Sequence, residues 1–490
     1  MTRKNITIVL FALALALPVF SAVPSRAAVP GNIIPENAAA IENFTPSQDD
    51  GTYYGVRFPK PQRPAEGELA MDAEWRIWIP DGVEKLRGVV VHQHGCTMWD
   101  SGRYAVYDLH WQELARKHGC ALISSSFFHI NMDCVCWCDP RRGSADSFVA
   151  ALEYFAKVSG HVELTSVPWA IWGHSGGAQW ASCMVQLYPE RIVGAFLRSG
   201  HPHTKGPLLG ELPMSGAVST VPVLLNLGAK EYSIRIIWDE AWPYFQMMRS
   251  RGAKIGLIID PRSHHETGDT RYPAIRFLDL CLSARLPEEP PADSAQPPVL
   301  RDMPGVILPE SEVTDQELSV AVTPADADQW NYYSAEDRRA FIRDGLWFPS
   351  ADFIDLWRGY SIDNSFDDPT PPPAPTDLKL TVGEQGGAKL TWRCRADLES
   401  GLKTFRIWRK KEGSDAWELA AELPTAQSVG CRPLFQGCGY GDTPYGNDPV
   451  GPFPTMTYNL GELDRQPAAN YTVSAVNTVG LESEKGRSVP

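Results

Sequence analysis

The sequence is short of positive charge and has no long apolar run beyond its first twenty residues. It contains 59 Asp and Glu but only 45 Lys and Arg, which gives a formal net charge of -14 and a pI near 5.3. Nucleic acids and anionic membrane surfaces both select clustered basic residues. We therefore expect no nucleic-acid partner, and no membrane span once the N-terminal segment described next has been removed.

The N-terminus has the three parts of a secretory signal. Arg3-Lys4 is followed by an apolar stretch over 6–19 and then by Ser25-Arg26-Ala27, with small residues at the first and third positions before a cleavage point. The apolar stretch is short for a membrane span, although an uncleaved anchor is the alternative. The pattern predicts a signal peptide over residues 1–27 and a secreted or periplasmic protein.

Ten cysteines are too few for a small domain held together by disulfides, but an exported chain favours their oxidation. Three of them stand with single spacers at Cys134, Cys136 and Cys138. On a strand these side chains would point the same way, so we expect distant partners, with Cys96 and Cys183 as candidates, and at least two of the three thiols blocked. Zinc binding is the alternative. In the C-terminal part, Cys431 and Cys438 are close enough along the chain to pair.

The length predicts two or three domains. Between residues 70 and 287 apolar strands alternate with helical patterns, which predicts a mainly parallel sheet with helices on both faces. The expected strands are 74–80, 88–92, 121–123, 169–172, 192–197, 221–227 and 255–259, and the expected helices are 107–115, 144–157, 176–187, 241–248 and 274–284. We assign residues 28–287 to this α/β domain.

A polar, Pro-rich stretch begins near Pro287, and structure returns over 329–360 with nine aromatic residues. We interpret residues 288–376 as a linker with an aromatic helical extension that packs on the first domain. A substrate-contacting aromatic flap is the alternative. A second Pro run over 369–375 precedes the last domain, so we expect it to be tethered.

One motif can support covalent chemistry. Gly173-His174-Ser175-Gly176-Gly177 follows a short apolar strand and leads directly into a helix. Glycines allow the backbone to turn tightly there, so Ser175 would stand exposed at the end of a sheet, where a nucleophile is needed. The alternative is a purely structural turn.

The motifs around this serine resemble those of the α/β-hydrolase fold. His94-Gly95 follows a central strand and Gly176-Gly177-Ala178 follows the serine, as in esterases of the polyhydroxyalkanoate-depolymerase and feruloyl-esterase-like branch. The resemblance covers residues 70–287. It implies the chain order nucleophile, acid, histidine.

By this resemblance Glu231, just past the strand 221–227, is the acid, with Asp239 and Asp260 as competitors. His265 is the base and His264 the alternative base. The backbone N–H groups of Cys96 and Gly176 would form the oxyanion hole. No cofactor is implied, and no metal is expected, because no third ligand accompanies the adjacent histidines.

From residue 377 to 490 the pattern changes to short alternating strands, which predicts an all-β sandwich. The strand around Trp392, the turn Ser400-Gly401-Leu402 and the Tyr-x-Val-x-Ala-x-Asn-x-x-Gly run over 471–480 resemble a fibronectin type III domain. Such modules occur beside polymer-degrading enzymes, so a polysaccharide ester or a polyester is a candidate substrate by analogy.

The sequence thus predicts a serine hydrolase that cleaves carboxylic esters through an acyl-enzyme, with an ester substrate, polymeric carbohydrate included, as its partner. A serine peptidase of the same fold is one alternative. A non-catalytic polysaccharide-binding protein is the other.

Overall fold

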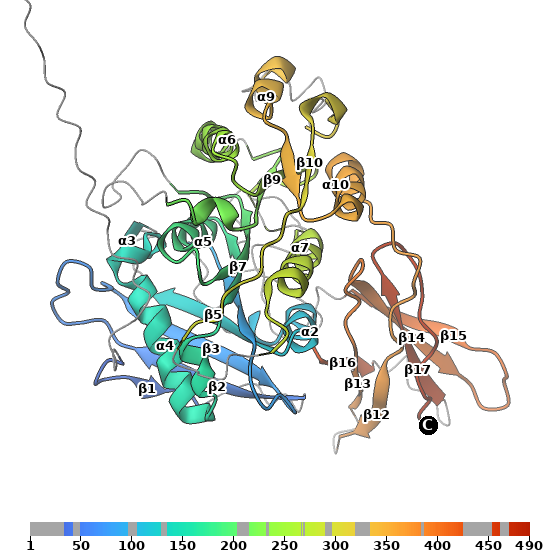
Figure 1. The fold of residues 1–490 in the computed structure, drawn as a ribbon. Coiled ribbons are helices and arrows are strands. Elements are labelled where there is room, and N and C mark those ends of the chain that lie inside the picture. Colours follow the sequence, from blue (N-terminus) through green and yellow to red (C-terminus); the bar gives the residue numbers. More distant parts are fainter. Residues whose placement is uncertain are drawn as a thin grey trace, which may run out of the picture.

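A computed structural model describes residues 34–42, 50–96, 105–128, 135–202, 215–231, 235–265, 267, 270–289, 296–318, 334–383, 387–424, 453–460 and 470–490 (Figure 1). The predicted signal over 1–27 and the Cys431–Cys438 pair lie outside these residues.

A nine-stranded mixed sheet forms the centre of the larger part, in the order β1-β2-β3-β5-β4-β6-β7-β8-β9. Its strands are β1 (Ala39–Ala40), β2 (Gly51–Phe58), β3 (Asp72–Pro80), β4 (Gly88–Gln93), β5 (Cys120–Phe128), β6 (Trp169–His174), β7 (Ile192–Arg198), β8 (Val223–Gly228) and β9 (Ile255–Asp260). The first three pair antiparallel, β3 also pairs antiparallel with β5, and all pairs from β5 to β9 are parallel. The mainly parallel sheet is therefore confirmed.

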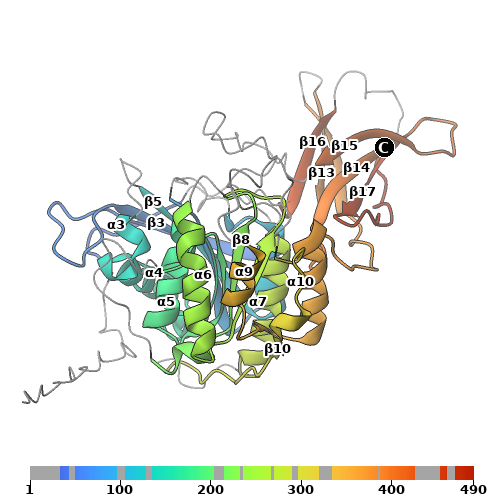
Figure 2. The same ribbon diagram turned by 90° about the horizontal axis from the view of Figure 1, so that it is seen from above.

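Helices cover both faces of this sheet (Figure 2). The helices are α2 (Leu109–Lys117), α3 (Val135–Cys138), α4 (Ser144–Ser159), α5 (Gly176–Leu187), α6 (Arg235–Ser250), α7 (Arg271–Arg285), α9 (Ala335–Phe341) and α10 (Ala351–Asp363). By their contacts, α4, α5 and α6 lie on one face, and α2, α7 and α10 on the other. This arrangement fits the α/β-hydrolase fold that the sequence predicts. None of the helices within the described ranges combines the length and apolarity needed to cross a bilayer.

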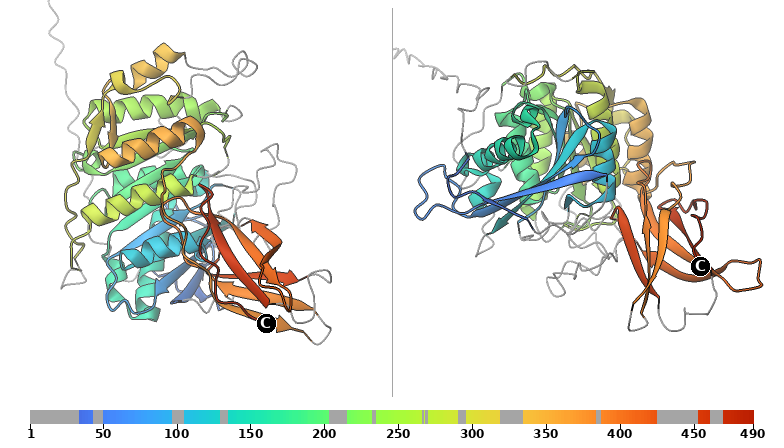
Figure 3. Two further views of the ribbon diagram at one scale, coloured as in Figure 1. Left: turned by 90° about the vertical axis from the view of Figure 1, so that its right-hand side faces the viewer. Right: turned by 90° about the horizontal axis from the view of Figure 1, so that it is seen from below.

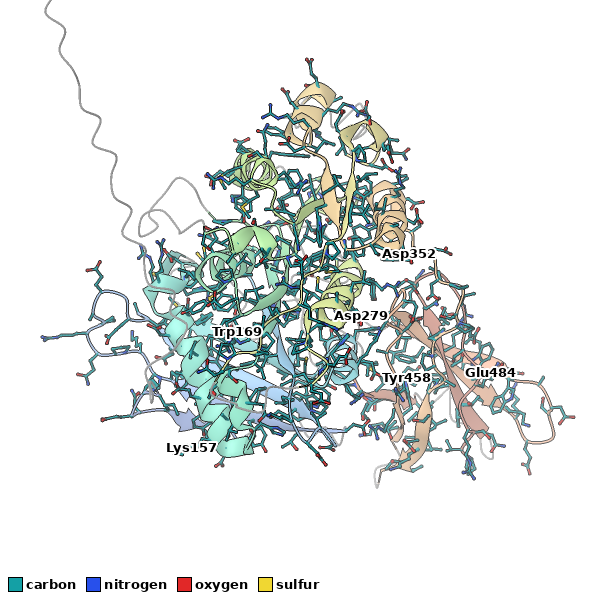
Figure 4. All side chains as sticks on the ribbon, in the orientation of Figure 1. Lys157, Trp169, Asp279, Asp352, Tyr458 and Glu484 are labelled. Atoms are coloured by element: carbon teal, nitrogen blue, oxygen red, sulfur yellow. The ribbon has the colours of Figure 1, made fainter. Side chains whose placement is uncertain are left out.

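Burial explains why the parallel strands have continuous apolar sequences. Every residue of β4, β6, β7 and β8 is buried, as expected for strands covered by helices on both faces. Large rings fill the space between sheet and helices, and Trp169 is one of them (Figure 4). Helix α7 starts at Arg271, three residues before the predicted position 274. Pro273 is compatible with this earlier start, because it falls in the first turn, where no backbone N–H is required.

The extension after residue 296 belongs to the same core. Its two strands β10 (Val306–Leu308) and β11 (Leu346–Phe348) pair antiparallel. Strand β11 and helix α10 lie against β9, and Trp357 donates a hydrogen bond of 2.8 Å to the carbonyl of Leu257. Phe353, Trp357 and Tyr360 are buried there. The aromatic residues that the structure describes in this extension therefore support packing on the first domain rather than an open flap.

The C-terminal part is a β domain of two three-stranded antiparallel sheets (Figure 3). One contains β12 (Thr376–Val382), β13 (Ala388–Arg393) and β16 (Thr455–Leu460), and the other β15 (Glu418–Pro424), β14 (Leu402–Lys410) and β17 (Asn470–Asn477). Trp392, Phe405 and Val473 belong to its buried cluster.

The β domain is docked on α2 and α7 by specific contacts. The side chain of Leu109 from α2 joins the buried cluster of the β domain. Leu402 donates its N–H to His110 Nε2 over 3.3 Å and accepts a hydrogen bond from the Tyr272 hydroxyl, also 3.3 Å. Ion pairs such as Arg395–Glu113, 3.1 Å, lie at the edge. These contacts make the domain part of one packed body, contrary to the tether expected from the Pro run.

Candidate active site

The expected sharp turn stands between β6 and α5. Ser175 has φ 54° and ψ -123°, a conformation that is strained for a residue with a side chain and that sites for chemistry often contain. A Cβ on Gly173 would lie 2.4 Å from the carbonyl oxygen of Gly177, and one on Gly177 would lie 2.3 Å from that of His94. Glycines at both positions are therefore required for the backbone to pass so close.

Three side chains that are far apart in the sequence meet at this turn. The Ser175 hydroxyl lies 2.8 Å from His265 Nε2, and His265 Nδ1 makes a short hydrogen bond to Glu231 Oε1. Because ionised Glu231 can only accept, the Nδ1 proton points to it and the Nε2 lone pair faces the serine. The structure thus brings together the nucleophile, base and acid that the sequence suggested.

Glu231 is held by more than the histidine. Its side chain is fully buried, and Oε2 accepts hydrogen bonds from the Ser199 hydroxyl at 2.7 Å and the Gly228 N–H at 3.2 Å. Both donors satisfy a buried carboxylate oxygen and fix the orientation of the side chain. Ser199, the residue directly after β7, was missed by sequence reasoning. Its position at the carboxyl edge of a buried strand was the available signal.

The competing residues take other places. Asp239 is half-buried on α6, and Asp260 accepts hydrogen bonds from Tyr360 and Asn364 at the end of β9. His264 is half-buried and its carbonyl oxygen accepts from Arg198 over 2.7 Å. It is the imidazole of His265 that faces Ser175.

The two predicted oxyanion-hole residues flank the serine. Gly176 is the first residue of α5, where backbone N–H groups have no partner within the helix. Cys96 follows Gly95, and a Cβ on Gly95 would lie 3.1 Å from the Ser175 Cβ, so the chain after β4 runs directly over the turn. Cys96 is disulfide-bonded.

Buried imidazoles extend inward from the site. The ring of His174 lies 5.1 Å from that of His265, and the ring of His92 lies 4.2 Å from that of Trp172. Burial lowers the pKa of both His92 and His174 well below the usual value, so these rings are neutral. His174 Nε2 donates to the backbone carbonyl of His265 at 2.6 Å and thereby helps to fix the main chain at that residue.

The cysteine prediction is wrong for two of its three residues. Cys136 and Cys138 are thiols, and so is the candidate partner Cys183. The expectation assumed a strand, whereas Val135–Cys138 is a short helix in which residues two apart point in different directions. Cys134 lies outside the described residues. Within the described ranges no group of three or more His, Cys, Asp or Glu side chains could hold a metal ion.

No family model matches this chain, and no curated protein does. Among solved structures it is similar to poly(aspartic acid) hydrolase-1 from Sphingomonas sp. KT-1, at 17% identity over 41% of this chain and 92% of that one, with a TM-score of 0.33. It is also similar to a dienelactone hydrolase from Anabaena variabilis, at 16% identity over 49% and 100%, with a TM-score of 0.32.

A ferulic acid esterase is a third structure of this kind, at 12% identity over 48% of this chain and 98% of the other, with a TM-score of 0.34. Likenesses at this level do not bear on substrate or mechanism. The function is therefore argued from the site of this chain alone.

Proposed function

We propose that this protein is a serine hydrolase that cleaves carboxylic esters through an acyl-enzyme intermediate. The observation that supports it most strongly is the continuous hydrogen-bond chain from the Ser175 hydroxyl through His265 to the buried Glu231 carboxylate. A serine hydroxyl is a weak nucleophile alone, and a base aligned by a buried acid is the arrangement that activates it.

In the first half of the reaction, Ser175 Oγ attacks the ester carbonyl while its proton passes to His265 Nε2. Glu231 stabilises the imidazolium through Nδ1–H, and the two further hydrogen bonds to its Oε2 hold the carboxylate in place. The imidazolium then protonates the leaving alcohol. In the second half, His265 takes a proton from water, which attacks the acyl-serine, and then returns that proton to Ser175 Oγ as the acyl–oxygen bond breaks and the acid is released.

The tetrahedral intermediates carry a negative oxygen that needs hydrogen-bond donors. We propose the backbone N–H groups of Gly176 and Cys96, since Gly176 opens α5 and Cys96 follows the close contact of Gly95 with Ser175. Each such donor is typically worth about 3 kcal/mol of transition-state stabilisation. The positive end of the α5 dipole acts in the same direction.

We further propose that the protein works outside the cytoplasm, as an esterase of the polyhydroxyalkanoate-depolymerase and feruloyl-esterase-like branch. The signal-like segment over 1–27 supports export. The fibronectin type III-like pattern of the C-terminal domain supports a polymeric ester, either a polysaccharide ester or a polyester, as the substrate.

Ser175→Ala is the direct test, with Ser182→Ala as its matched control. Ser182 lies on α5, and its buried hydroxyl donates to the Gln179 carbonyl at 2.7 Å, away from the proposed triad. Loss of Ser175 should abolish labelling by a fluorophosphonate probe and lower turnover of short aryl esters by on the order of 10⁴-fold or more. Ser182→Ala should keep both.

A panel of acetyl, feruloyl, methyl-glucuronoyl and hydroxyalkanoate esters, together with peptide amides, then identifies the substrate class. A folded wild-type protein that neither labels at Ser175 nor turns over any ester would refute the proposal. Preferential cleavage of amides would point to the peptidase alternative.

A further inference from the structure

The base of the proposed triad stands on a tight loop that leaves the sheet at the end of β9. Glu231 aligns the ring of His265, but the ring can reach Ser175 only if the main chain of the loop is also fixed. From within the α/β domain, Arg198 holds this loop through the Ser263 hydroxyl at 2.9 Å and the His264 carbonyl at 2.7 Å. A second set of contacts comes from a different part of the chain.

That second set is centred on Asp260, the last residue of β9, which is 2% exposed. Its Oδ1 accepts the backbone N–H groups of Arg262 at 3.0 Å and Ser263 at 3.3 Å, which shapes the first turn of the loop. The same carboxylate accepts the Tyr360 hydroxyl on Oδ2 at 2.8 Å and the Asn364 amide on Oδ1 at 3.1 Å. One buried carboxylate thus joins the start of the loop to α10.

Helix α10 is itself fixed, so its contacts can transmit position. Phe353 at its start packs edge-on against Phe277 of α7, with ring centroids 6.0 Å apart, and Tyr360 is fully buried with its ring centroid 5.8 Å from that of Phe366. Asn364 caps the helix with φ 60° and ψ 26°, a left-handed conformation that asparagine tolerates well. The two donors therefore approach Asp260 from a rigid support.

We infer that Tyr360 and Asn364 are positioning residues for His265, acting through Asp260, and that the aromatic extension is required to build the active site. The inference rests on the proposed function. Without these two donors Asp260 is free to turn toward water or away from the N–H groups of the loop, and the His265 ring moves relative to Ser175. Small displacements of this kind are costly, because proton transfer depends on hydrogen-bond distance.

The test uses conservative variants of the full chain. Tyr360→Phe removes one hydroxyl, and Asn364→Gly removes the amide while keeping a residue suited to the left-handed conformation. Trp357→Phe is the matched control, because it lies one turn away on the same helix, is equally buried, and loses a hydrogen bond to β9 rather than to Asp260. For each variant we would measure the rate of fluorophosphonate labelling of Ser175 across pH, and thermal stability.

We expect Tyr360→Phe to label about tenfold more slowly than the wild type, which is the effect of one lost buried hydrogen bond, with a shifted pH profile. The double variant should label more slowly still. Trp357→Phe should lose thermal stability and label at the wild-type rate. If Trp357→Phe slows labelling as much as Tyr360→Phe does, the effect is general loosening and the inference is overturned.

A second readout does not depend on activity. The imidazole NMR resonances of His265, assigned by their loss in His265→Gln, should shift in Tyr360→Phe and stay unchanged in Trp357→Phe. Unchanged resonances in Tyr360→Phe overturn the inference whatever the labelling rate. If the wild type does not label at Ser175, the proposed function fails, while the NMR comparison still decides whether Tyr360 positions the ring.

Discussion

Acidification from about pH 7.5 to about pH 5.5 should lower the free energy of unfolding steeply, because three histidines are buried as neutral rings. His92 in β4, His110 in α2 and His174 in β6 are at most 1% exposed. Burial lowers the pKa of each well below the ordinary value of 6.5, since a charged ring would lose its hydration there.

The sign follows from proton binding in the two states. A group whose pKa is depressed by folding stabilises the fold fully above its unfolded pKa, here 6.5, and this contribution is lost as the pH falls from there toward the folded pKa. An imidazole that stays neutral in the folded protein at pH 5.5 lowers the free energy of unfolding by about 1.4 kcal/mol, because the unfolded chain binds a proton and the folded chain does not. Three such groups give up to about 4 kcal/mol, a large share of the about 5 to 15 kcal/mol that a domain usually has.

The assay is urea unfolding followed by tryptophan fluorescence at several pH values. The raised pKa values of the buried Asp108 and Asp397 act in the opposite direction, so one variant must isolate the histidine contribution. His92→Met replaces the imidazole by an apolar side chain of similar size and removes one titrating group. We expect its stability to fall by about 1.4 kcal/mol less than that of the wild type over the same pH range.

The explanation is refuted if stability stays level or rises on acidification, or if His92→Met keeps the full wild-type pH dependence. A change in the urea m-value with pH would indicate a different unfolding reaction, and the comparison would then be made within the first transition alone.

Two further predictions concern the docked β domain and the acid. Gly401→Ala should destabilise the fold by about 2 kcal/mol more than Gly413→Ala in thermal or urea unfolding. Both glycines have positive φ, but a Cβ on Gly401 would lie 1.7 Å from the Tyr272 ring, whereas a Cβ on Gly413 would have no atom within 4 Å. Equal losses would show that the interface is not closely packed at this point. Ser199→Ala should slow ester turnover by about tenfold at unchanged KM, since a buried Glu231 oxygen loses its 2.7 Å donor, and steady-state kinetics with unchanged kcat would contradict this role.

Much of the fold was predictable because the hydrophobic pattern of its strands and helices is compatible with only one kind of sheet. Continuous apolar strands, separated by amphipathic helices, can bury both faces of a sheet only in a mainly parallel arrangement, and β4, β6, β7 and β8 have that pattern. The tight turn at Ser175 could also be predicted from local sequence. Two backbone segments pass so close there that only glycine fits at both positions.

The weaker predictions concerned segments whose conformation is set by their neighbours. Cys136 and Cys138 were placed on a strand, and only the packing of the short helix α3 against α5 shows otherwise. The tether expected from the Pro run was wrong as well, because composition does not reveal whether a following domain finds a surface to bind. Here the surface is provided by Leu109, His110 and Tyr272.

The sequence by itself determined the order of the main strands and helices from β3 to α7, the position of Ser175 at a strand end, and a short set of candidates for its base and acid. Tertiary structure decided which of those residues meet: His265 rather than His264, and Glu231 rather than Asp260. The physical reason is that a side chain's direction on a loop depends on what holds the backbone. For this loop the holding groups, Arg198 and Tyr360, are respectively 66 residues before His264 and 100 residues after Asp260 in the chain.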